Sequence, residues 1–112
     1  MKFDVPIYGG EVWIFKNKSE FLSAQLELGD DEDIQEGGLG DAWVVQSPYR
    51  DECIYLVGVY DKNLGTLVHE LSHTALNILE TANFNAHDGN GEPFCYLLNY
   101  LFDMCYGWFI DN

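Results

Sequence analysis

Three residues within one short segment have the types and spacing to bind a metal ion and activate water. The segment is HELSH, in which His69 and His73 are four positions apart and Glu70 follows the first histidine. On a helix, residues four apart lie one turn above each other on the same face, so both imidazoles can bind one ion. Glu70 would then lie beside that ion and take a proton from water. The pattern predicts a Zn²⁺ site at His69 and His73, with Glu70 as the catalytic base of a hydrolase.

A zinc site of this kind needs a further protein ligand, for which the chain offers several candidates downstream. Glu92 opens the next predicted helix, where a rigid element would hold a ligand firmly, and we prefer it. His87 and Asp88 lie in a Gly-rich loop and stay open as alternatives, with Asp103 as a more remote one. A structural interpretation of Glu92 also stays open, since a carboxylate at a helix start is stabilised by the helix dipole.

Two polar residues could assist such a site. Tyr96 lies four positions after Glu92 and so shares its helix face, where its hydroxyl could stabilise an oxyanion. A core or rim position for Tyr96 is the alternative. Asn77 lies one turn after His73 and could either orient a ligand or cap the helix.

The elements that must position these residues can be predicted from hydrophobic periodicity. Apolar residues at helical spacing predict a helix over 64–82, which carries the HELSH segment, and a second helix over 92–108 with Pro93 in its first turn. Ser19 as an N-cap predicts a shorter helix over 19–28. The segments 41–47 and 53–60 are predicted to form a hairpin joined by a turn at 48–51, and residues 3–15 a strand or hairpin with its better part at 11–15.

These elements indicate one α+β domain over residues 1–112, since a chain of this length closes a single core. We expect a small, mostly antiparallel sheet with the two C-terminal helices packed on one face and the shorter helix nearby. The acidic segment 30–36 is predicted to be an exposed loop. It is not a calcium loop of the EF-hand type, because a count from Asp31 places Glu36 where a glycine is required.

Composition excludes several classes of partner. The chain has 5 Lys and Arg against 19 Asp and Glu, a formal net charge of −14, so nucleic acid and anionic membranes would be repelled. No signal peptide or transmembrane segment is visible at the sequence level. The 3 cysteines form no CxxC pair, which favours a reducing compartment. We expect a cytoplasmic protein whose oligomeric state the sequence does not indicate.

The HELSH segment, its helix and the preceding strand CIYLVGVY resemble the zincin metallopeptidases. Glu92 on the following helix resembles the gluzincin branch, and the runs HELSHTALNIL and GEPFCYLLNYL are similar to small phage-encoded HExxH proteins of unassigned substrate. The resemblance spans about residues 54–102. It implies an edge strand beside the active-site cleft, the HExxH helix packed under the sheet, His69 and His73 as zinc ligands, Glu70 as base and Glu92 as third ligand.

The chain departs from these families in specific places. Tyr96 stands where gluzincins usually have an Asp that orients a ligand histidine, and Leu76 and Leu79 exclude the metzincin pattern. No second lobe is evident that would build substrate pockets.

Three functions stay open at this point. The preferred one is a minimal zinc metallopeptidase acting on a peptide or protein substrate. The second is a non-catalytic acidic protein that docks on a basic partner surface as an inhibitor would, with strong salt dependence and indifference to chelators. The third is a zinc hydrolase of a non-peptide amide.

Overall fold

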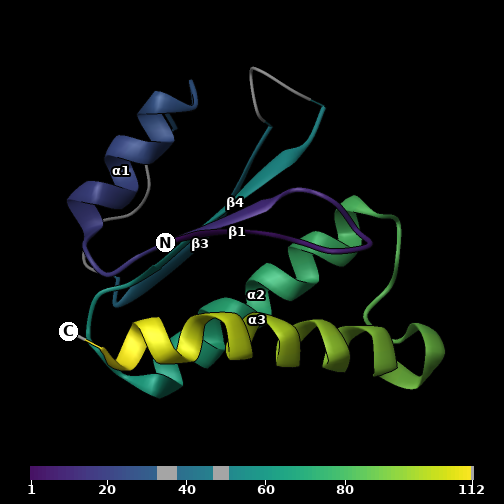
Figure 1. The fold of residues 1–112 in the computed structure, drawn as a ribbon. Helices are drawn as coiled ribbons and strands as arrows, with labels where there is room; N and C mark the ends of the chain where they lie inside the picture. The colour runs from purple at the N-terminus through teal and green to yellow at the C-terminus, as the bar shows by residue number, and fades with distance from the viewer. Residues whose placement is uncertain (33–37, 47–50, 112) are drawn as a thin grey trace.

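The computed structural model of this chain describes residues 1–32, 38–46 and 51–111 and shows a mixed sheet with three helices (Figure 1). In chain order the elements are β1 (Lys2–Asp4), β2 (Glu11–Phe15), α1 (Lys18–Glu27), β3 (Gly40–Gln46), β4 (Cys53–Val59), α2 (Leu64–Thr81), a short 3₁₀ turn (Asp88–Gly91) and α3 (Glu92–Ile110). The described strands are ordered β1-β2-β4-β3. β2 and β4 are parallel and the other two pairings are antiparallel, which confirms the predicted α+β class with a mostly antiparallel sheet.

Strand alternation places apolar side chains on both faces of the sheet. Val12, Ile14 and Val57 face a core that they share with α2 and α3, whereas Trp13 and Leu56 belong to a second core with α1. Figure 1 shows α1 on one side of the sheet and α2 with α3 on the other. The two C-terminal helices therefore pack on one face, as predicted, and α1 covers the opposite face.

The starts of α1 and α2 are set by side-chain caps that the sequence only partly revealed. α1 begins at Lys18 because the Asn17 side chain accepts hydrogen bonds from the backbone N–H groups of Ser19 and Glu20, at 2.8 and 3.3 Å. The prediction of Ser19 as the N-cap was wrong, because Asn17 caps the helix two residues earlier and the N–H of Ser19 is itself one of the capped donors. α2 begins after Asn63, whose side chain accepts from the N–H of Gly65 at 2.7 Å.

One acidic residue of the predicted 30–36 loop has a structural role. The Asp30 carboxylate accepts from the N–H of Glu32 at 2.9 Å and from the indole N–H of Trp43 at 2.8 Å, so it ties the segment after α1 to β3. These bonds lower the pKa of Asp30 below its ordinary value. Residues 33–36 of that loop, Ser47 at the end of the predicted strand and 48–50 of the predicted turn lie outside the described residues.

No helix in the part of the chain that the structure describes is long and apolar enough to cross a membrane.

Two of the three cysteines are expected to differ strongly in reactivity. Cys105 is buried in the core beneath the sheet, and burial raises the pKa of its thiol to about 12, whereas Cys95 is exposed on α3. At pH 8 an ordinary thiol is roughly one quarter ionised and Cys105 about one part in ten thousand. Iodoacetamide should therefore modify Cys95 at least about a thousandfold faster than Cys105 in the folded protein, as followed by mass spectrometry of peptides.

Denaturant supplies the control for this prediction. Unfolding should bring the two labelling rates together, because both thiols then have ordinary surroundings. Equal rates in the folded protein would show that Cys105 is not enclosed by the packing of α3 on the sheet.

Candidate metal centre

The two histidines of the HELSH segment converge on one point from the exposed side of α2. His69 and His73 are one helical turn apart, their ring centroids are 4.7 Å apart, and their Nε2 atoms are separated by 3.2 Å. Two nitrogens bound at 2.0–2.1 Å to one tetrahedral zinc ion would be about 3.3 Å apart. The rings therefore already have the separation that a shared zinc ion requires.

Glu70 lies beside the histidines but points inward. Its side chain is buried, with 7% of its surface exposed, while both histidines are exposed. Ligand atoms of His69, Glu70 and His73 all lie within 4.8 Å of one another, so the three residues could hold one ion. The difference in exposure comes from the positions of these residues around the helix. Glu70 lies on the buried face with Leu67, Leu71 and Thr74, whereas the histidines lie on the adjacent exposed side.

The first residue of β3 leaves room for the Glu70 side chain. A Cβ atom added at Gly40 would meet the Glu70 Cγ and Oε2 atoms at 2.8 Å and the Gly58 carbonyl oxygen at 2.7 Å. Only a residue without a side chain therefore lets α2 come this close to the strand. β3 is also the outermost strand on this side of the described sheet, so Glu70 lies directly beneath a sheet edge.

The surroundings of Glu70 act on its acidity in both directions. Burial is the largest influence and raises the pKa of the carboxyl. The neighbouring His69 and His73 lower it, and the negative charge of Asp41 raises it again, with a net rise above the ordinary value. A carboxyl whose pKa is raised holds a transferred proton better than an ordinary glutamate does, which suits a general base working near neutral pH.

A polar cluster next to Glu70 was not predicted from the sequence. The Asp41 carboxylate accepts from the Tyr60 hydroxyl at 2.8 Å and from the Lys18 ammonium at 2.9 Å. Burial, followed by this hydrogen bond and the charge of Asp41, raises the pKa of Tyr60, and Glu70 contributes to that rise. The hairpin register pairs Asp41 with Gly58 and so brings Asp41 and Tyr60 to the same end of the sheet. Only a known register could have revealed this cluster.

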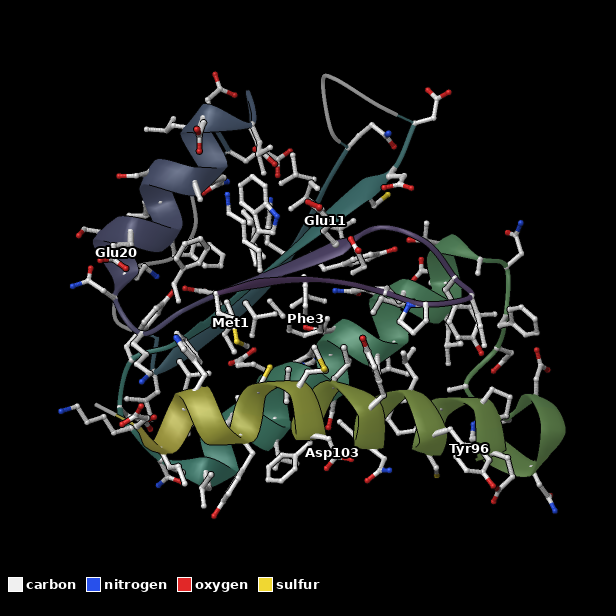
Figure 2. The ribbon with its side chains drawn as sticks, in the orientation of Figure 1. Met1, Phe3, Glu11, Glu20, Tyr96 and Asp103 are labelled. Atoms are coloured by element: carbon white, nitrogen blue, oxygen red, sulfur yellow. The ribbon has the colours of Figure 1, made fainter. Side chains whose placement is uncertain are left out.

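The structure does not bring the residues predicted on α3 to the histidines. Among the described residues, the His69 group contains no fourth His, Cys, Asp or Glu, so Glu92 is outside it. Glu92 and Tyr96 instead line a pocket between the start of α3 and the turn that joins β1 to β2. Asp103 lies further along α3 and is exposed (Figure 2).

The other residues that the sequence suggested as ligands or helpers of the metal centre lie in local structure around α2 and the turn before α3. Asp88 accepts from the N–H of Asn85 at 2.8 Å and so closes the turn before α3. His87 is exposed in that turn. Asn77 is half-buried on α2, one turn after His73, and its backbone carbonyl accepts from the Thr81 hydroxyl at 2.9 Å. Neither His87 nor Asp88 joins the metal-binding group of described residues.

Replacing Gly40 by Ala should disturb this centre specifically. The new methyl group would overlap both the Glu70 side chain and the Gly58 carbonyl, so Gly40→Ala should lower the free energy of unfolding by about 1–3 kcal/mol. Gly107→Ala is the matched control, because a Cβ there has nothing within 4 Å and alanine favours a helix by about 1 kcal/mol. Urea unfolding of the two variants measures the difference, and equal stabilities would contradict the close approach of α2 to β3.

Compared with known proteins, the chain matches no protein-family model, no curated protein and no solved structure. A function for it must therefore be argued from its own residues and their geometry.

Proposed function

We propose that this protein is a zinc-dependent hydrolase, with a peptide or protein as the preferred substrate class. The observation that carries the proposal is the convergence of the His69 and His73 Nε2 atoms to 3.2 Å on an exposed face, with the Glu70 carboxylate in the same group. A hydrogen bond between two neutral rings would give the same separation, and zinc binding distinguishes the two arrangements.

The donor set fits zinc rather than a harder cation. Two imidazole nitrogens are ligands that zinc accepts in a tetrahedral site, whereas calcium and magnesium prefer oxygen ligands alone. A bound zinc ion would supply Lewis acidity towards a carbonyl oxygen and would acidify water. His69 and His73 would hold it on α2, with the Glu70 carboxylate beside them in the same group.

The role proposed for Glu70 is to accept a proton from the attacking water and return it to the leaving group. Its carboxylate lies within 4.8 Å of both histidine nitrogens, and its other side faces Gly40 so closely that a Cβ there would overlap it. The Asp41 charge and burial make the carboxylate a better proton acceptor than a free glutamate. Neighbouring side chains therefore tune Glu70 for proton transfer without themselves reaching the substrate.

The position of the sheet edge supports a peptide as substrate. β3 is the outer strand beside α2, and Gly40 at its start touches the proposed base. An extended peptide could pair with such an edge through backbone hydrogen bonds and place a carbonyl near the histidines. This arrangement, an edge strand next to the HExxH helix, is the one that the zincin resemblance implies.

Metal analysis and an activity assay on the unmodified protein test the proposal. The purified protein, dialysed against zinc and then against buffer, should retain one equivalent of zinc by elemental analysis. A set of internally quenched peptides should be hydrolysed by this form, not after treatment with a chelator, and again after zinc is restored.

Two results would contradict the proposal. Zinc binding below one equivalent at micromolar concentrations would remove the metal centre. Full zinc binding without hydrolysis of any peptide or simple amide would leave a structural metal site and favour the acidic binding protein described above.

A further inference from the structure

A second site lies away from the histidines, between the β1–β2 turn and the first half of α3. It is a pocket of about 550 Å³ whose walls are mainly apolar, with Pro6, Ile7 and Tyr8 on one side and Glu92, Tyr96 and Tyr100 on the other. This volume falls within the range of small-molecule sites, which combine apolar walls with a few polar groups. Figure 1 shows the purple β1–β2 turn reaching towards the start of α3.

The walls of the pocket are held by contacts outside it. The Tyr100 hydroxyl donates to the Asp4 carbonyl at 3.0 Å, and its ring packs edge-on against Phe3. The Tyr8 ring packs edge-on against Phe84, with centroids 6.0 Å apart. Two of the three tyrosines are therefore fixed before any ligand arrives, which reduces the entropy cost of binding.

The turn that forms one wall is strained. The N–H of Tyr8 donates to the Pro6 carbonyl at 2.7 Å, two residues back, and Ile7 between them has a φ of 70°. A three-residue turn with positive φ is rare, and a β-branched residue is among the least suited to it. The Ile7 side chain is 97% exposed, so no core contact within the described residues explains the strain. Strain of this kind, of the order of 1–3 kcal/mol, concentrates at binding sites.

The charge of the pocket selects the class of ligand. Apart from its tyrosines, the described lining of the pocket has one ionisable side chain, the carboxylic acid of Glu92. The chain as a whole carries a net charge of −14. Aromatic rings also attract cations placed over their faces. An anion would face Glu92 without a compensating basic side chain in the lining.

We propose that this pocket binds a small organic cation, with its apolar body against Tyr8, Tyr96 and Tyr100 and its protonated amine at the Glu92 carboxylate. Tyr96 is 70% exposed and stands near the start of α3 in Figure 2, where it forms the outer rim of the pocket and can close over a ligand by rotation of its side chain. This function is separate from the metal centre, because Glu92 and Tyr96 are outside the histidine group.

Three probes of nearly equal shape test the charge preference. They are 3-phenylpropylammonium, 3-phenylpropanol and 3-phenylpropionate, titrated into the protein and followed by NMR chemical shifts at about 150 mM salt. A chelator is present throughout, so the outcome does not depend on zinc. The ammonium compound should bind at least about fivefold more tightly than the alcohol, and the carboxylate most weakly.

Variants on α3 locate the effect. Glu92→Gln should reduce the affinity for the ammonium probe to that for the alcohol and leave the alcohol unchanged. Tyr96→Ala, at an exposed position, should weaken both. Asp103→Asn is the matched control, since it removes the same charge from the same helix outside the pocket and should change neither affinity.

Several outcomes would overturn the proposal. These are the absence of saturable binding up to about 10 mM of the ammonium probe, equal affinity for the three compounds, tightest binding of the carboxylate, or an effect of Asp103→Asn as large as that of Glu92→Gln. The last would mean that the overall negative charge, and not the pocket, attracts the amine.

Discussion

Glu70→Gln should lower hydrolysis of a peptide substrate by about a hundred- to ten-thousandfold while the protein still retains one equivalent of zinc. The amide has nearly the shape of the carboxylate, so its contact with Gly40 should be preserved. It cannot accept a proton from water, and that is the function proposed for this side chain. The measurement is kcat/KM for one cleaved peptide together with zinc stoichiometry, both compared with the unmodified protein.

The fold of this variant can be checked through the pH dependence of its stability. Burial raises the pKa of Glu70 above 4.5, so the folded protein holds this proton more tightly than the unfolded chain does. The contribution of Glu70 to the stability of the zinc-free, unmodified protein should therefore fall as pH rises above 4.5, towards the folded-state pKa. Glu70→Gln lacks this loss, and without zinc it should be more stable than the unmodified protein at pH 7, with the advantage fading at pH 4.

Hydrolysis that survives the Gln substitution would show that another group activates water. A loss of zinc together with a loss of activity would show that Glu70 is a ligand rather than a base. These two results separate the roles that the geometry gives to a carboxylate lying within 4.8 Å of both imidazole nitrogens.

Local sequence patterns were sufficient for the elements of this fold. The apolar spacing of Leu67, Leu71 and Ile78 predicts the buried face of α2 because a helix of 3.6 residues per turn must place them together. The parallel pairing of β2 with β4 was not predicted, since it joins segments more than forty positions apart through side chains that show no register. Hydrophobic alternation says which face of a strand is buried and not which strand lies beside it.

The same contrast between local patterns and distant contacts applies to the candidate site. His69 and His73 are brought together by one helical turn, a local relation that the sequence contains. Glu92 was predicted at the metal because it begins the next helix, but the direction in which α3 returns along α2 depends on tertiary packing. The Asp41 and Tyr60 pair depends on the β3–β4 register, with Asp41 opposite Gly58. Contacts between elements therefore account for most of what the sequence did not reveal about this site.

His73→Ala should reduce zinc occupancy to about half or less under conditions that saturate the unmodified protein. The substitution removes one of the two converging imidazoles, and we expect the affinity for zinc to fall at least about a hundredfold. Even residues that only hydrogen-bond to a metal ligand change the affinity by about ten- to a hundredfold when they are replaced. At a zinc concentration one hundred times the dissociation constant, the unmodified protein gains about 2.7 kcal/mol of stability, or roughly 10 °C in Tm. His73→Ala should show at most about 0.4 kcal/mol of this gain in a calorimetric scan with added zinc.

His87→Ala is the matched control for that experiment. It removes the remaining histidine of the chain, which lies exposed in the turn before α3 and outside the metal-binding group, so its zinc-dependent rise in Tm should equal that of the unmodified protein. Without zinc, both variants should unfold within about 0.5 kcal/mol of the unmodified protein, because both side chains are exposed. A rise in Tm that persists in His73→Ala but vanishes in His87→Ala would place the metal at the α2–α3 turn, and the 3.2 Å approach of the two Nε2 atoms would then be a hydrogen bond between neutral rings.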